Sequence, residues 1–212
     1  MQSLHRRFQI KIALIGATGF IGSRILAEAL DRGHQVTAIV RNPEKVPERS
    51  GVTAKKGDVF DEAGLAQLIA GHDAVISAVH FLASDAGKLL GAVKKSGVKR
   101  YLVVGGAGSL KIGPGQDLID SPHFPPQYKE EAGKGRDFLN LLRTETSLDW
   151  TFLSPAALIE PGTRTGKFRL GKDDLVATAA GESKISAEDY AVALIDELEK
   201  PQHIRQRFTL AY

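Results

Sequence analysis

Three glycines recur every third residue in the segment Gly16-Ala17-Thr18-Gly19-Phe20-Ile21-Gly22. A bound pyrophosphate requires a sharp turn, backbone amides that no Cβ shields, and close contact between a strand and the following helix, and glycines at these positions supply all three. The spacing alone also suits a purely structural turn, but a strand, a turn, a helix and a second strand stand here in the required order. We therefore predict a dinucleotide-binding site whose phosphate contacts lie at Gly16, Thr18, Gly19, Phe20, Ile21 and Gly22.

Short apolar runs that alternate with helical patterns surround this motif. Alternating strands and helices of this length are typical of a parallel sheet, because parallel strands need crossover connections that cover the sheet. The sequence therefore predicts an α/β fold of the NAD(P)-binding Rossmann type, a doubly wound parallel sheet with helices on both faces. The predicted strands are 10–15, 35–40, 52–56, 73–79, 99–104, 149–153, a small one near 166–170, and 208–210; the predicted helices are 20–30, 61–70, 85–96, 127–143 and one that Ser186 begins as N-cap.

The length of 212 residues suits one domain with a single core. We predict a dinucleotide-binding core over 1–155 and a small C-terminal, substrate-side extension over 156–212. The segment 105–126 contains four prolines and no clear periodicity. Long loops of this kind in compact domains are usually functional, so this one is predicted to be an irregular lid over the substrate.

The end of the second predicted strand bears on which dinucleotide binds. NAD-specific domains carry an acidic residue there, which accepts hydrogen bonds from the adenosine ribose. Arg41 stands at this position, and a guanidinium can hold a 2′-phosphate through paired hydrogen bonds. NADP(H) is therefore the predicted cofactor and NAD(H) a possible one; the alternative is that Arg41 is an ordinary surface residue.

Composition excludes several other classes of protein. There is no cysteine, so thiolate catalysis, disulfides and iron–sulfur clusters are excluded, and the six histidines have no companions at metal-ligand spacing. The net charge of +3 comes from scattered residues, with His5-Arg6-Arg7 as the nearest approach to a basic run, so no nucleic-acid partner is expected. No apolar segment has the length of a membrane span, and a cytoplasmic protein with a small-molecule substrate is expected. The oligomeric state is not indicated.

The wider G-x-x-G-x-x-G spacing, together with later segments, resembles the atypical or extended branch of the short-chain dehydrogenase/reductase superfamily. The segments are Gly57-Asp58, Ser77-Ala78-Val79, Val103-Val104-Gly105-Gly106-Ala107-Gly108, Leu148 to Pro155 and Ile185 to Ala191. Within that branch the chain is similar to NAD(P)H-binding proteins of the flavin reductase, biliverdin reductase B and NmrA-like group. The resemblance implies further cofactor contacts at Asp58, which would meet the adenine edge, and at Val59, Ala78, Val79, Gly105 and Pro155.

The catalytic pattern of the superfamily is incomplete. Its members commonly use a Ser, and a Tyr with a Lys four residues later, but here Ala132 stands four residues after Tyr128. The residues left in comparable places are Ser109, Tyr128 and Lys134, which we list as catalytic candidates; Ser109 suits a turn equally well and Tyr128 suits packing beneath the long loop. His80 follows a strand directly and can donate a proton, although a structural histidine is the commoner case.

Hydride transfer to a flavin or another conjugated acceptor needs no resident acid, because the solvent can deliver the proton. The sequence therefore favours an NADP(H)-dependent reductase of a flavin-like, quinone-like or other electron-poor small molecule. A redox sensor that binds NADP(H) without turnover, as NmrA-like proteins are taken to do, is equally compatible with the missing pair. A sugar-nucleotide epimerase is disfavoured by the missing pair and by the short C-terminal part.

Overall fold

A computed structural model describes residues 9–212, and its centre is an eight-stranded sheet in the order β10-β12-β8-β5-β4-β1-β2-β3. Every pairing in this sheet is parallel except that of β10 with β12. The strand bounds are β1 (Lys11–Ile15), β2 (Gln35–Val40), β3 (Val52–Lys56), β4 (Ala74–Ser77), β5 (Arg100–Val104), β8 (Asp149–Ser154), β10 (Arg169–Gly171) and β12 (Gln206–Ala211).

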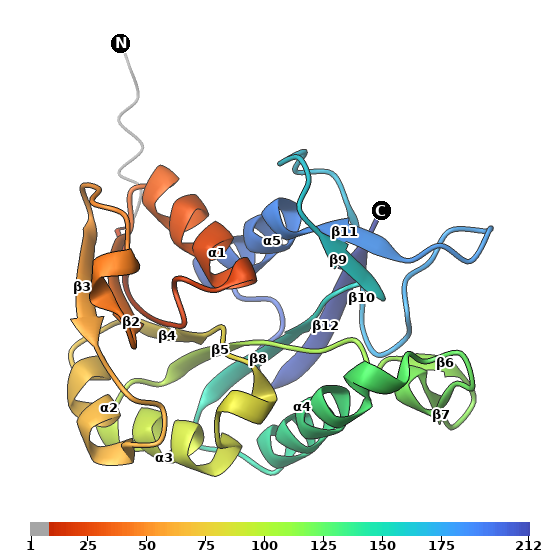
Figure 1. Cartoon of the computed structure of the whole chain (residues 1–212), viewed down its shortest axis with the longest axis horizontal. Helices are drawn as coiled ribbons and strands as arrows, with labels where there is room; N and C mark the ends of the chain where they lie inside the picture. The colour runs from red at the N-terminus through yellow and green to blue at the C-terminus, as the bar shows by residue number, and fades with distance from the viewer. Residues whose placement is uncertain (1–8) are drawn as a thin grey trace.

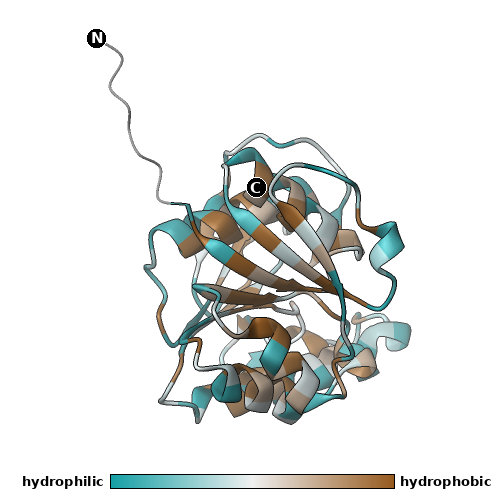
Figure 2. Ribbon diagram, turned by 90° about the vertical axis from the view of Figure 1, so that its left-hand side faces the viewer, coloured by the Kyte–Doolittle hydropathy of each residue, from teal (hydrophilic) through white to brown (hydrophobic). Residues whose placement is uncertain are grey.

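Helices cover both faces of the sheet (Figure 1). One face carries α1 (Phe20–Asp31) and α5 (Ala187–Glu199), and the other carries α2 (Glu62–Ile69), α3 (Ala86–Ser96) and α4 (Lys129–Arg143). Alternate residues of β1 show why, since Ile12 and Leu14 are buried in one core cluster while Ala13 and Ile15 are buried in the other. Figure 2 shows the same arrangement as largely hydrophobic strands between the two helical layers. The predicted Rossmann-type α/β fold is confirmed.

Three of the helices, α2, α3 and α5, begin at a residue whose side chain caps the first turn. Asp61 caps α2 by accepting from the Gly64 amide at 3.0 Å, and Asp85 caps α3 by accepting from the Lys88 amide at 2.8 Å. Ser186 caps α5 as predicted, with its Oγ accepting from the Asp189 amide at 3.0 Å. Such caps satisfy amides that the first helical turn leaves without partners. Two helices begin without a side-chain cap. The first turn of α4 carries Glu130 and Glu131 instead, whereas at α1 Gly19 offers no side chain and no acidic residue follows it.

The prediction of an irregular loop over 105–126 was wrong. This segment contains a small antiparallel hairpin of β6 (Lys111–Gly113) and β7 (Gln116–Asp117), followed by a 3₁₀ turn. Two further short strands, β9 (Leu158–Glu160) and β11 (Lys184–Ser186), pair in parallel outside the main sheet and were missed. Strands of two or three residues carry too little hydrophobic alternation to be recognised, and the pairing of β9 with β11 joins distant segments.

The C-terminal part continues the main sheet, because β12 pairs with β8 and β10 pairs with β12. The division near residue 155 stays a prediction. The basic run at 5–7 lies outside the described residues. Within 9–212, no helix is long and apolar enough to cross a membrane, and no group of acidic or histidine side chains is arranged to hold a metal ion.

Candidate functional site

The glycine turn between β1 and α1 brings three segments into very close contact. Gly16 has a φ of +85°, and a Cβ there would collide with the carbonyl oxygen of Ala78 at the end of β4. A Cβ on Gly22 would collide with the carbonyl oxygen of Gly16, and the Gly19 amide donates to that same oxygen at 3.0 Å. The turn therefore requires glycine at both 16 and 22: a side chain at either position would push the strand, the turn and the helix apart.

The N-terminal turn of α1 suits an anion. Its first amides receive no side-chain cap and face no carboxylate in the first turn, in contrast with α2, α3 and α5, whose caps are Asp61, Asp85 and Ser186. Free amides and the partial positive charge of a helix N-terminus together favour a phosphate group. This end of α1 opens into the largest described cleft of the molecule.

That cleft has a volume of about 980 Å³ and lies along the carboxyl ends of β1 to β5. It is within the size range of protein sites for small molecules and cofactors. Predicted cofactor contacts that line it are Gly16, Thr18, Gly19, Phe20, Ile21, Arg41, Asp58, Val59, Ala78, Val79 and Gly105. Gly22 lies beneath the turn, and Pro155 is buried at the end of β8 and does not line the cleft.

One end of the cleft, at β2 and β3, adjoins a second pocket of about 360 Å³. Thr18 and Arg41 line both spaces, and the smaller pocket adds Lys45 and Arg49. Arg49 also forms an ion pair with the exposed Asp31. Of these three cationic residues, only Arg41 was predicted from the sequence as a cofactor contact. Lys45 and Arg49 were missed because they stand in an irregular segment whose approach to the glycine turn depends on the fold.

The opposite end of the cleft, at β4 and β5, is shaped by contacts between distant segments. Phe81 begins a 3₁₀ turn (η2, Phe81–Ala83), and its ring stacks on Phe152 at 6.4 Å and meets Phe138 edge-on at 6.1 Å between centroids. The carboxylate of Glu131 on α4 accepts from the Phe81 amide at 2.7 Å and from the Leu82 amide at 2.9 Å. One carboxylate therefore fixes the η2 turn against α4.

The three predicted catalytic residues lie elsewhere, since none of them lines the cleft. Tyr128 is 59% exposed where η4 (Pro126–Tyr128) meets α4, and Lys134 is exposed on α4 itself. Ser109 is buried, and its hydroxyl accepts from Nη1 of Arg207 at 3.4 Å. Their catalytic role stays a prediction, and their positions in the fold do not support it.

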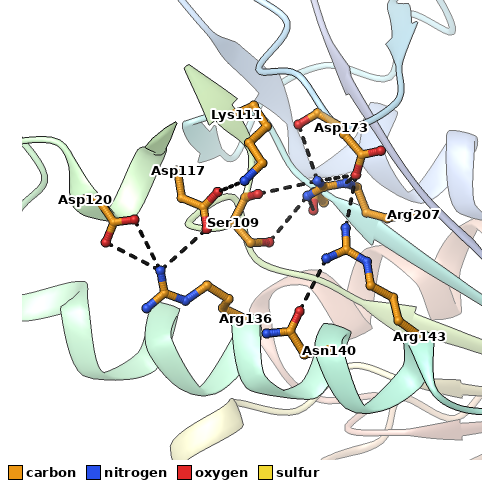
Figure 3. A network of polar contacts seen from close by, with 10 residues as sticks. Ser109, Lys111, Asp117, Asp120, Arg136, Asn140, Arg143, Asp173 and Arg207 are labelled. Carbon is orange, nitrogen blue, oxygen red and sulfur yellow. Dashed lines mark hydrogen bonds and ion pairs between the residues drawn. The ribbon is translucent and has the colours of Figure 1, made fainter. Parts of the chain in front are cut away.

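Ser109 belongs to a network of charged and polar groups that holds the β6–β7 hairpin (Figure 3). Arg207 on β12 is almost completely buried, and its Nε donates to the Asp173 carboxylate at 2.9 Å. Burial lowers the pKa of the Arg207 guanidinium, while the hydrogen bond and the charge of Asp173 oppose that shift. Lys111 in the hairpin pairs with Asp117 at 2.5 Å. The network fixes the hairpin to the sheet, so we assign Ser109 a structural contact there.

Comparisons with known proteins agree with this geometry. A family of NAD(P)H-binding proteins matches residues 16–201. A proposed exported protein of Burkholderia pseudomallei is 51% identical, with a TM-score of 0.87 over 96% of this chain and 100% of its own. A proposed epimerase of Bacteroides thetaiotaomicron is 47% identical, with a TM-score of 0.92 over 96% of this chain and 97% of its own.

A proposed NADH-flavin reductase of Streptococcus pneumoniae is 38% identical, with a TM-score of 0.83 over 95% of this chain and 99% of its own. Only two of the three descriptions name an activity, and those two differ, so the three structures establish kinship and fold without a common reaction. The matched region contains the glycine turn and every described residue that lines the cleft except Ile15 at the end of β1. The chain belongs to this family of NAD(P)H-binding proteins.

Proposed function

We propose that the protein binds NADP(H) in the cleft and transfers hydride to a flavin-like, quinone-like or other electron-poor small molecule. The observation that carries the proposal is the uncapped N-terminus of α1, which opens into a cleft of about 980 Å³. The dinucleotide would extend along the carboxyl edge of the sheet. Its pyrophosphate would lie at the glycine turn, and its two nucleosides would reach the two ends of the cleft.

The preference for NADP(H) over NAD(H) rests on the smaller pocket. Arg41, Lys45 and Arg49 bring three cationic side chains to its lining, and within residues 9–212 no acidic side chain lines it. A 2′-phosphate adds negative charge to the adenosine, so a cationic lining favours NADP(H) over NAD(H). Asp58 stands at the end of β3 in the same half of the cleft, where the adenine would lie.

The preference for a conjugated acceptor rests on the opposite end. Phe81, Val104 and Gly105 give it an apolar lining beside the carboxyl ends of β4 and β5. An apolar site of this kind suits a flat aromatic molecule stacked near the nicotinamide. The superfamily's Tyr–Lys pair is missing, which disfavours alcohol dehydrogenation, because that reaction requires a resident group to move the alcohol proton.

The test is steady-state turnover of the purified full chain with NADPH or NADH, using FMN and menadione as acceptors and following loss of the nicotinamide absorbance. We expect oxidation with at least one acceptor and a kcat/KM for NADPH that exceeds that for NADH by about tenfold or more, which corresponds to 1.4 kcal/mol of differential binding. Equal kcat/KM values would contradict the cofactor preference. Tight NADPH binding without oxidation of any acceptor would contradict the reductase and leave the redox sensor as the function.

A further inference from the structure

Among the described residues, only two titratable side chains line the half of the cleft at β4 and β5, namely His80 and Glu131. The other titratable groups among the described lining residues are Arg41, Lys56, Asp58 and Asp61, which stand at or after the ends of β2 and β3. In the sheet, β1 lies between β4 and β2, so the ends of β2 and β3 are two strand positions or more away from β4 and β5. Any proton that accompanies hydride transfer must therefore come from His80, from Glu131 or from water.

Glu131 already holds the backbone of the η2 turn. Both of its carboxylate oxygens accept backbone amides, one from Phe81 and one from Leu82. Because both oxygens are engaged as acceptors by the η2 backbone, Glu131 is held in place by the turn and is not directed at a ligand in the cleft. It remains free to hold a cation or an N–H donor, and Nδ1 of His80 lies 3.4 Å from its Oε1.

His80 has the chemistry and the freedom that a proton donor needs. An imidazole changes protonation state near neutral pH, and a contact from Nδ1 to a carboxylate leaves Nε2 available to a ligand. Its side chain is 86% exposed, lines the cleft and is the N-cap of η2, the turn that Glu131 fixes. No other charged group forms an ion pair or a hydrogen bond with the His80 ring among the described residues.

We propose that His80 donates the proton that accompanies hydride transfer, and that Glu131 is the residue that positions it. This inference rests on the proposed reductase function. Hydride passes from C4 of NADPH to the acceptor, which gains two electrons, while the Nε2 proton of the imidazolium passes to a nitrogen or oxygen of the acceptor. The products are NADP⁺, the reduced acceptor and a neutral His80, which takes a proton from solvent.

The test compares His80→Gln with His123→Gln in the full chain, using NADPH with menadione and with FMN. His123 is a matched control because it is also exposed but lies in the 105–126 segment and does not line the cleft. We expect His80→Gln to lower kcat about 100-fold, the lower range for general acid catalysis, with the Kd for NADPH unchanged. His123→Gln should retain the wild-type kcat.

The pH profile separates proton donation from a structural role. Since the donor must be protonated, the kcat of the wild type should fall as the pH rises, and His80→Gln should lose this dependence. Glu131→Gln removes the neighbouring negative charge, so the fall should move to lower pH. Added imidazole should restore part of the activity of His80→Ala, because the exposed site can admit it.

The outcomes distinguish this inference from the function on which it rests. A His80→Gln variant with wild-type kcat and an unchanged pH profile would overturn the proton donor and leave the reductase intact. A low kcat in His80→Gln with an unchanged pH profile and no imidazole rescue in His80→Ala would show a structural residue and overturn the inference. A wild type that binds NADPH but reduces neither acceptor would overturn the reductase, and the inference with it.

Discussion

The two ends of the cleft are built in different ways. At the glycine turn, seven consecutive residues from Gly16 to Gly22 determine the geometry, and the adjoining pocket adds cations from the segment that follows β2. At β4 and β5, the wall depends on Glu131 reaching Phe81 across 50 residues of sequence, and on aromatic packing with Phe152. A local motif can therefore identify the end of the cleft at the glycine turn, which we call the binding end. The end at β4 and β5, which we call the reactive end, forms only when distant segments meet in the folded chain.

The largest expected effect is at the glycine turn. Gly16→Ala combines a positive φ with a collision against the Ala78 carbonyl, so we expect NADPH affinity to fall by about 100-fold or more, close to 3 kcal/mol. Gly33→Ala is the matched control, since Gly33 also has a positive φ but faces open space. It should cost about 1 kcal/mol of unfolding free energy and leave NADPH affinity unchanged. Calorimetric titration and urea unfolding check both, and similar NADPH affinities for the two variants would refute the account.

The second effect concerns the network that anchors the β6–β7 hairpin. Asp173→Asn leaves the buried Arg207 without its carboxylate partner, although Asp173 itself is 56% exposed and solvent screens the pair, so we expect a loss of about 2 kcal/mol in unfolding free energy. Asp149→Asn is the control, because its ion pair with Arg205 is about half exposed and should be worth less than about 1 kcal/mol.

NADPH affinity in Asp173→Asn should stay within about threefold of the wild type, because the binding end is built locally. A threefold change corresponds to less than about 1 kcal/mol. Urea unfolding and calorimetric titration are the measurements. A parallel loss of NADPH affinity would show that the hairpin network and the glycine turn are energetically coupled, and would contradict the local origin of the binding end.

The smallest effect is expected at Tyr128. Its ring is exposed and does not line the cleft, so Tyr128→Phe should change kcat by less than about twofold, against the roughly 100-fold or greater loss typical of a proton-transfer residue. Steady-state rates with menadione check this. A loss of the larger size would restore the role that sequence analysis predicted for Tyr128 and place the reactive end closer to α4 than its geometry indicates.

The fold and the close packing of the glycine turn were predictable because their signals are local. The order of strands and helices follows from hydrophobic periodicity, and Ser186 and the glycine turn follow from residue types at fixed spacing. His80 was recognisable from its place directly after a strand, but the burial of Ser109 was not predictable, because nothing near Ser109 indicates that Arg207, 98 residues away, will contact it. The role of Glu131 was equally hidden, since a glutamate on a helix gives no sign that it will hold the backbone of a distant turn.

The most direct test of the account is the binding of NADPH and NADH to the wild type and to Arg41→Asp, measured by calorimetric titration. Arg41 faces both the cleft and the cationic pocket. We predict that Arg41→Asp weakens NADPH binding by about 100-fold, because a charge-assisted contact is replaced by repulsion, and changes NADH binding by less than about threefold. Equal losses for the two cofactors, or no loss for NADPH, would contradict the assignment of the 2′-phosphate to this pocket.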